Sequence, residues 1–275
     1  MSSSHQSVIE EFRANAGKVG GPYEGSELIL LSTTGADSPE PHTVPLGVLA
    51  EKGEDGQLFV VASAPGADGH PAWYRNLLAR PLVQVETGTD RYEAVAVPVE
   101  GPRRDELLDG EPAVGAGAGE AIAVVALHRS HEPVTDEPGL AGRLLNIHGW
   151  LRTELALVRQ LAAEEEARGK PITSLGLQLR QHCLAFCHSL ESHHHGENGG
   201  LFPLLEEKAP QMREFIERML VEHEVIARLE AELAAALDEP GEGFSERVDR
   251  MSRELEAHLD GEEEELLPVL RALGV

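Results

Sequence analysis

The fold of the C-terminal half is decided by the stretch His193-His-His-Gly-Glu197-Asn-Gly-Gly-Leu201-Phe-Pro203, which recurs without a gap as His258-Leu-Asp-Gly-Glu262-Glu-Glu-Glu-Leu266-Leu-Pro268. In both copies a His stands four residues before a Glu, and a Leu-x-Pro follows at the same distance. Residues four apart are neighbours on one face of a helix, so each copy can direct an imidazole and a carboxylate at the same point. Two such pairs that face each other in a helical bundle can hold two metal ions.

The sequence around the two copies predicts four helices. From Leu140 onward, Leu and Ala recur at helical spacing among many Glu and Arg residues, and Gly and Pro mark the breaks. We expect helices over residues 140–168, 174–207 with an interruption near Gly199-Gly200, 210–237 and 244–272. Four helices with short connections are typical of an up-down bundle.

Each of the other two helices offers one further histidine. The predicted metal ligands are four imidazoles and two carboxylates: His148, His193, Glu197, His223, His258 and Glu262. This set favours two ions of iron or manganese, because a structural zinc site usually takes about four ligands, often thiolates. Taken singly, each His also fits an ordinary helix residue, and the doubled pattern is what favours metal. We interpret His182, His188, His194 and His195 as residues that orient ligands or lie at the surface.

The first 127 residues predict a different fold. Apolar or alternating stretches at 27–34, 42–49, 57–63, 81–87, 92–99 and 121–127 predict short strands, and residues 71–79 predict a helix. Several short strands separated by turns favour a small β-barrel. The chain is thus expected to be multidomain, with a barrel over residues 1–130 and an all-α bundle over residues 131–275.

Composition excludes several classes of function. The 275 residues carry a formal net charge of −25, which should repel a phosphate backbone, so we expect no nucleic-acid partner. No apolar run is long enough to cross a bilayer, and the N-terminus lacks the pattern of a signal peptide. We therefore expect a cytoplasmic protein with no membrane partner. Cys183 and Cys187 are interpreted as small buried helix residues, with a thiol role as the alternative.

One loop of the N-terminal half is a candidate ligand site. The small residues Ser63 and Gly66 follow a strand, and a helix with Trp73 and Tyr74 begins after Pro71. Small residues let a backbone approach a flat ligand closely, and aromatic rings can pack on it. The alternative is that the two aromatic residues fill the core of the barrel.

Residues 140–275 resemble a hemerythrin-type cation-binding domain, through His148, the two His-x3-Glu copies and Glu222-His223. The resemblance implies a non-haem di-iron centre that would react with O2, peroxide or NO. Oxygen-carrying hemerythrins have a second His four residues from the one on the third helix, where this chain has Met219 and Ala227. An open metal position favours redox chemistry or sensing over oxygen carriage.

Residues 8–127 resemble the deazaflavin-dependent nitroreductase family, through Thr33-Thr-Gly35, Pro45-Leu, Ala62-Ser63 with Gly66, and Pro71-x-Trp73-Tyr74-x-Asn76-Leu77. The resemblance implies a split β-barrel that uses reduced coenzyme F420, or FMN, to reduce quinones or nitro compounds. It implies a catalytic role for Ser63 and cofactor contacts from Ser63, Gly66, Pro71, Trp73, Tyr74 and Asn76. Basic residues common in the family are replaced by Ala36-Asp37 and Ala64, and the Gly- and Ala-rich segment 103–119 is expected to lack the helix that closes the substrate pocket.

The sequence thus predicts an oxidoreductase of the deazaflavin-dependent nitroreductase or quinone reductase type, which passes electrons to a small substrate or to the di-iron bundle. The alternative is a non-catalytic protein that senses O2, redox state or iron and retains a degenerate reductase domain. A purely structural zinc is a third reading. Pairing into a homodimer is expected by analogy with other split barrels.

Overall fold

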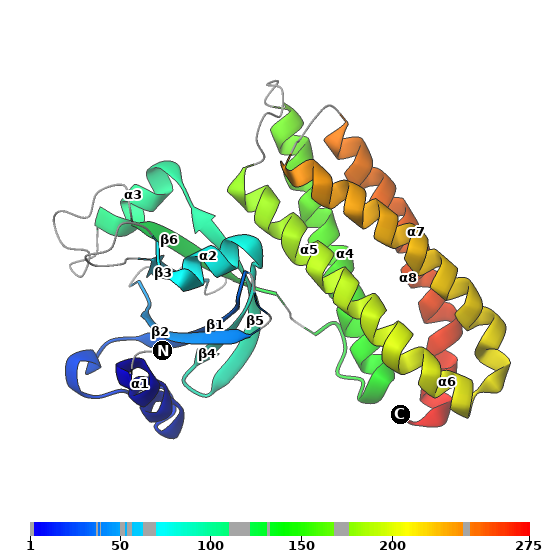
Figure 1. The fold of residues 1–275 in the computed structure, drawn as a ribbon, viewed down its shortest axis with the longest axis horizontal. Coiled ribbons are helices and arrows are strands. Elements are labelled where there is room, and N and C mark those ends of the chain that lie inside the picture. The colour runs from blue at the N-terminus through cyan, green and yellow to red at the C-terminus, as the bar shows by residue number, and fades with distance from the viewer. Residues whose placement is uncertain are drawn as a thin grey trace. The chain divides into compact units, whose positions relative to one another are not determined.

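The computed structural model describes residues 3–36, 38, 40–49, 53, 57–62, 70–109, 122–130, 133–167, 176–238 and 243–275. Contacts between Cα atoms divide the chain into two compact units, residues 1–131 and 132–275. Strands with short helices form the first unit, and long helices form the second (Figure 1).

Six antiparallel strands form one curled sheet in the N-terminal unit, in the order β2-β1-β4-β5-β6-β3. The strands are β1 (Leu28–Thr34), β2 (Pro41–Gly47), β3 (Leu58–Ala62), β4 (Leu82–Thr87), β5 (Asp90–Val99) and β6 (Ala123–Arg129). A bridge between Val48, just after β2, and Val60 of β3 joins the two ends of this order. The sheet is therefore a curled half-barrel, and the predicted split-barrel fold is confirmed.

The inner face of the sheet is apolar because its strands place branched residues at every second position. In β4, Val83 and Val85 are buried while their neighbours are more exposed. Helix α2 (Ala72–Ala79) packs against the same core through Trp73, Tyr74 and Leu77. Burial of each such side chain contributes about 1.5–3 kcal/mol, so α2 is held firmly to the sheet.

Two helices of the N-terminal unit were not predicted. Helix α1 (Ser3–Ala14) buries Ile9 and Phe12 against β1. Helix α3 (Gly101–Asp109) buries Leu107 beside Phe59. Residues 103–109 of the segment expected to lack the pocket-closing helix are thus helical, and Leu107 and Leu108 anchor them to the sheet. The remainder of that segment lies outside the described residues. A 3-10 turn, η1 (Gly21–Tyr23), precedes β1.

Four long helices form the second unit, and the predicted bundle is confirmed. They are α4 (Gly139–Ala167), α5 (Leu177–Gly196), α7 (Arg213–Asp238) and α8 (Phe244–Leu273). Helix α4 contacts α5 and α8, and α7 contacts the same two helices, so the four form a closed ring around a common interior (Figure 1).

The second helical segment is interrupted where the sequence predicts it. A π-helical turn, η3 (Glu197–Leu201), follows α5 and contains both glycines, and helix α6 (Phe202–Lys208) continues from it. Pro203 stands in the first turn of α6, where its missing N–H costs little. A 3-10 turn, η4 (Pro210–Met212), leads into α7. π-helical turns are frequent at functional sites, and this one begins at Glu197.

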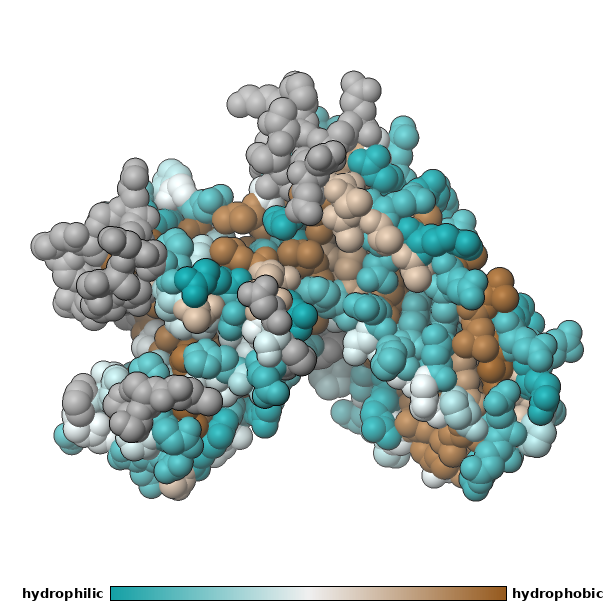
Figure 2. Space-filling model, viewed as in Figure 1, coloured by the Kyte–Doolittle hydropathy of each residue, from teal (hydrophilic) through white to brown (hydrophobic). Residues whose placement is uncertain are grey.

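The surface is mostly hydrophilic, with apolar areas over the helices (Figure 2). Among the described residues, the exposed large apolar side chains include Leu220, Val221 and Val225, all on α7. In the described part of the chain, every helix is too short or too polar to cross a membrane.

Candidate metal centre

The structure brings all six predicted metal ligands together in the interior of the bundle. Each helix supplies its share: His148 from α4, His193 and Glu197 from the junction of α5 and η3, His223 from α7, and His258 and Glu262 from α8. None of these side chains is more than 5% exposed. The α-helical spacing places His258 and Glu262 on one face, as the sequence pattern requires.

The carboxylate of Glu262 lies between two pairs of imidazoles. Its Oε2 is 3.4 Å from Nε2 of His148 and 3.8 Å from Nε2 of His193. Its Oε1 is 3.4 Å from Nε2 of both His223 and His258. Each oxygen thus faces a different pair, which is the arrangement of a carboxylate that bridges two ions.

Glu197 also reaches both pairs. Its Oε2 is 3.5 Å from Nε2 of His193 and 3.4 Å from Nε2 of His223. Such distances exceed the roughly 2.7–3.2 Å of a good N–H···O hydrogen bond. Two atoms that each lie about 2.1 Å from one ion are about 3.0–3.5 Å apart. The spacings therefore fit ligands of a shared cation better than hydrogen-bonded partners.

Buried polar atoms without hydrogen-bond partners support the same reading. Among the described residues, both oxygens of Glu197 and of Glu262 are buried with no hydrogen-bond partner, as are Nε2 of His223 and of His258. Each such atom costs about 1–3 kcal/mol when it stays unpaired. Because all of them point into one small volume, one or two cations would satisfy the whole set.

The other ring nitrogen of three imidazoles is held by a nearby oxygen. The pairs, Nδ1 to oxygen, are His148 with Glu263 at 2.9 Å, His223 with Asn198 at 2.8 Å, and His258 with Glu222 at 2.9 Å. With Nδ1–H donating to these oxygens, Nε2 of each ring carries the lone pair that a metal needs. Arg152 in turn donates to Glu263 at 2.6 Å, which fixes the carboxylate.

The pKa values of the two buried carboxyl groups, Glu197 and Glu262, are shifted in opposite directions. Burial, with help from the neighbouring Glu262, raises the pKa of Glu197 to about 10. Burial would also raise the pKa of Glu262, but the surrounding imidazoles outweigh burial and hold it well below its usual range. Burial lowers the pKa of His193, whereas Glu262 and Glu263 outweigh burial and raise that of His148. A divalent cation would displace the proton of Glu197 and let both carboxylates ionise.

Sequence reasoning missed some members of the site. His194 is 6% exposed, and its ring stacks on that of His223 with centroids 4.0 Å apart. Burial and the adjacent imidazoles lower the pKa of His194 to about 2, so it is neutral. The sequence pattern selects His193 from the His block and is silent on its neighbour. Asn198 and Glu263 directly follow the two predicted ligand carboxylates, and their matching place in the two aligned copies is the signal that could have found both.

The predicted cofactor residues are only partly described. Ser63 and Gly66 lie outside the described residues. Pro71 precedes the first turn of α2, while Trp73 and Tyr74 are 5% and 7% exposed in the core of the half-barrel. Asn76 donates to Thr33 Oγ1 at 3.1 Å and accepts from the Ala36 backbone N–H at 3.2 Å, so it ties α2 to the end of β1.

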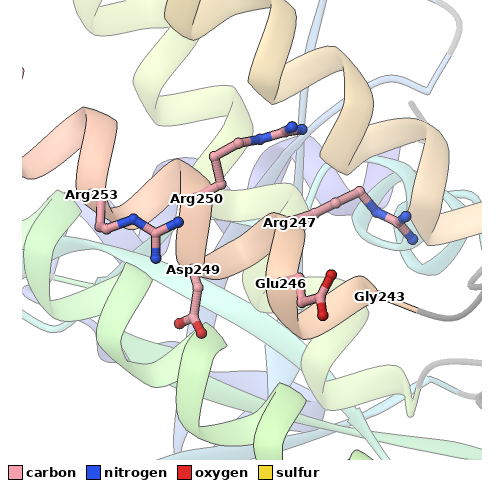
Figure 3. Close-up of a pocket in the computed structure, with 6 residues that line it drawn as sticks. All are labelled: Gly243, Glu246, Arg247, Asp249, Arg250 and Arg253. Atoms are coloured by element: carbon pink, nitrogen blue, oxygen red, sulfur yellow. The ribbon is translucent and has the colours of Figure 1, made fainter.

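Two other polar features lie in the bundle. Gly243, Glu246, Arg247, Asp249, Arg250 and Arg253 line an open hollow of about 460 Å³ at the start of α8 (Figure 3). Its charges are of both signs, with Arg250 paired to Glu232 and Asp249 to Arg159. Deeper in the bundle, Nδ1 of His182 lies 2.5 Å from Glu154 Oε1. Neither feature joins the metal ligands.

Comparison with known proteins matches both units. Residues 5–118 match the F420H(2)-dependent quinone reductase family, and residues 141–270 match the hemerythrin HHE cation binding domain. The chain is similar to an F420H(2)-dependent quinone reductase of Mycobacterium tuberculosis (strain ATCC 25618 / H37Rv), with 33% identity over 91 residues. That match covers 32% of this chain and 58% of the relative, so the chain spans little more than half the length of this curated relative.

A solved F420-H2 dependent reductase (FDR-A) is 30% identical, with a TM-score of 0.31, and the match covers 37% of this chain and 94% of that one. A solved domain-swapped dimer is also 30% identical with a TM-score of 0.31, and the match covers 37% of this chain and 80% of that one. By the two family matches, the N-terminal unit resembles the F420H(2)-dependent quinone reductase family, and the C-terminal unit resembles hemerythrin HHE cation-binding domains.

Proposed function

We propose that this chain is a redox protein in which a deazaflavin-dependent reductase domain is joined to a di-iron bundle. The observation that carries the proposal is the convergence of buried Nε2 atoms on two carboxylates that lack hydrogen-bond partners. Iron is favoured because the ligands are imidazoles and carboxylates, with manganese as the alternative. The covalent link keeps the two domains at high effective concentration.

The residues of the bundle have distinct parts in this proposal. His148, His193, His223 and His258 would bind the ions through Nε2, and Glu197 and Glu262 would bridge them. These side chains are buried and would keep bulk water from the ions. Two bound iron ions supply electron exchange with small oxidants such as O2, peroxide or NO.

The N-terminal domain would provide the reducing side. When bound, reduced coenzyme F420, or FMN in its place, supplies hydride to a small acceptor such as a quinone or nitro compound. Ser63 is proposed to face this acceptor, and Gly66, Pro71 and the start of α2 to position the cofactor. Trp73 and Tyr74 would act from the core behind the site, and Asn76 by keeping α2 against β1. Pairing into a homodimer is part of the proposal.

A second candidate function is a non-catalytic sensor of O2, redox state or iron with a degenerate reductase domain. One observation favours it: the aromatic side chains proposed to meet a flat cofactor are buried in the half-barrel core. The acidic character of the chain points the same way, because an anionic cofactor tail needs basic partners.

The two candidates are separated by one set of measurements on the full chain. The protein is loaded anaerobically with ferrous iron, and bound iron is counted per chain. Reduced F420 is then added with menadione or with O2, and the deazaflavin absorbance is followed. The proposal expects two iron ions and F420 oxidation with either acceptor.

A pair of variants locates the O2 reaction. Glu262→Gln should lose the iron and the O2-dependent oxidation of F420 but keep menadione reduction, whereas the exposed Glu264→Gln should change neither. Two iron ions without any F420 oxidation would favour the sensor. One zinc ion per chain in protein from an ordinary host would favour a structural metal.

A further inference from the structure

We propose that His194 is a fifth imidazole ligand of the metal centre, at the ion position formed with His223 and His258. This inference rests on the proposed function, since it requires that the bundle binds metal. It adds a residue that the sequence pattern does not select, and it divides the imidazoles into two and three.

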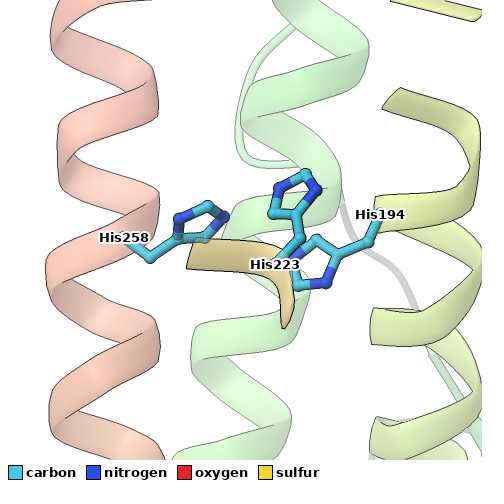
Figure 4. Close-up of side chains that lie close together, drawn as sticks. All are labelled: His194, His223 and His258. Atoms are coloured by element: carbon cyan, nitrogen blue, oxygen red, sulfur yellow. The ribbon is translucent and has the colours of Figure 1, made fainter. Parts of the chain in front are cut away.

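The geometry of His194 carries the inference. The rings of His194, His223 and His258 come from α5, α7 and α8 and turn toward one another (Figure 4). One ligand atom from each of the three lies within 4.8 Å of the others. A second set, formed by His148, His193, Glu197 and Glu262, meets the same condition. The centre therefore has two neighbouring positions with separate nitrogen donors.

The state of the His194 ring also points to a ligand. Its Nε2 is buried and has no hydrogen-bond partner among the described residues. A buried polar nitrogen left in this state is costly, and buried polar groups normally have partners. The ring faces other imidazoles rather than an apolar pocket, with centroids 4.0 Å from His223 and 5.3 Å from His258. A cation shared by the three rings would satisfy this nitrogen.

The helix explains how adjacent residues serve different positions. Successive side chains on an α-helix diverge by about 100°, so His193 and His194 both reach the interior but point to different parts of it. His193 approaches His148, with Nε2 atoms 3.2 Å apart, while His194 stacks on His223. His195, the third member of the block, is exposed.

His194 also accounts for the missing histidine on α7. Met219 lies in the apolar cluster at one end of the bundle, and Ala227 is exposed, so neither adjacent turn of α7 supplies a ligand. The imidazole that α7 lacks comes instead from α5. The inference replaces the sequence-based expectation that one ion is short of a ligand, because His194 brings the second position to three imidazoles, together with the shared carboxylates.

The test compares His194→Phe with His195→Phe in the full chain. Phenylalanine keeps a ring that can stack on His223 but has no nitrogen. Iron per chain and ferrous affinity are measured anaerobically by competition with a chelator, and helical circular dichroism verifies the fold. We expect two ions in the parent and in His195→Phe. In His194→Phe we expect one of the two ions to bind at least about 100-fold more weakly, beyond the roughly 10–100-fold typical of residues that only orient ligands.

Two ions bound with unchanged affinity in His194→Phe would show that His194 only packs, and the inference would be wrong while the proposed function stands. No ion in the parent protein would overturn both. If His194→Phe does not fold, anomalous X-ray diffraction from the cobalt-loaded parent decides. Nε2 of His194 within about 2.3 Å of an ion supports the inference, and a cobalt-bound centre with His194 farther away overturns it.

Discussion

Replacement of Glu230 by Gln should stabilise the bundle at neutral and alkaline pH. Glu230 is partly buried on α7, where burial first and the Glu191 carboxylate second raise its pKa from 4.5 to about 7. Over that range of pH the folded state binds more protons than the unfolded state. The free energy of unfolding therefore falls as the pH rises from 4.5 to about 7 and is level above it.

The size of this loss follows from the same values. A carboxyl whose pKa moves from 4.5 to about 7 would destabilise a fully buried site by about 3 kcal/mol at high pH. Because Glu230 is only partly buried, water screens the effect, and we expect about 1 kcal/mol. For a domain of this size that corresponds to roughly 3 °C in melting temperature.

The assay is urea unfolding of the metal-loaded protein at pH 5 and pH 8, followed by helical circular dichroism. Glu217→Gln is the matched control, because Glu217 is an exposed residue of the same helix. The difference in unfolding free energy between Glu230→Gln and the parent should grow by about 1 kcal/mol from pH 5 to pH 8. If that difference is the same at both pH values, or matches the control, Glu230 is solvated and the reasoning is refuted.

Three further predictions concern other parts of the chain. Glu263→Gln should weaken ferrous binding roughly 10–100-fold, because the His148 imidazole would be less firmly oriented. The affinity is measured by competition with a chelator, and an equal loss in the exposed Glu264→Gln would contradict the prediction. Asn76→Ala should destabilise the N-terminal domain by about 1–2 kcal/mol in urea unfolding, because it frees two hydrogen-bond partners; an unchanged midpoint would show that the link is dispensable. Burial raises the pKa of both Cys183 and Cys187, so neither should react with a thiol reagent at pH 8 until the bundle is unfolded; rapid labelling of the native protein would count against the packing.

Much of the fold was accessible from the sequence because strong local patterns coincide with tertiary packing. The alternation of Val83 and Val85 with Gln84 and Glu86 marks β4, and the Gly199-Gly200 pair marks the break after α5. Helix α1 was missed because its signal consists of few apolar residues. Ile9 and Phe12 are buried only because they pack on Leu28 and Leu30 of β1, and this contact cannot be deduced from the local sequence.

In the candidate site, too, local patterns predict some residues, and tertiary contacts are needed to find the others. The His-x3-Glu spacing selects the predicted ligands that share one face of a single helix. Helical spacing alone does not reveal a side chain whose partners lie on other helices. His194 belongs to this class, since His223 and His258 meet it across the bundle. Trp73 and Tyr74 show the opposite limit, because an aromatic-rich helix start is equally typical of a ligand site and of a core.

The internal repeat extends beyond the ligands themselves. Asn198 and Glu263 occupy the same place in the two copies, directly after Glu197 and Glu262. Asn198 accepts from Nδ1 of His223, and Glu263 accepts from Nδ1 of His148. Each copy therefore supplies its own imidazole and carboxylate and also orients the predicted ligand histidine of a neighbouring helix.

The two copies are not equivalent, however, because one uses a neutral amide where the other uses a carboxylate. Glu263 helps to raise the pKa of His148 against the effect of burial, whereas the oxygen that faces His223 carries no charge. The first copy also continues as a π-helical turn with two glycines, while the second stays α-helical through Glu263-Glu-Glu265. A more basic imidazole is a stronger donor to a cation. In the proposed centre, the difference between residues 198 and 263 would therefore make His148 a stronger donor than His223.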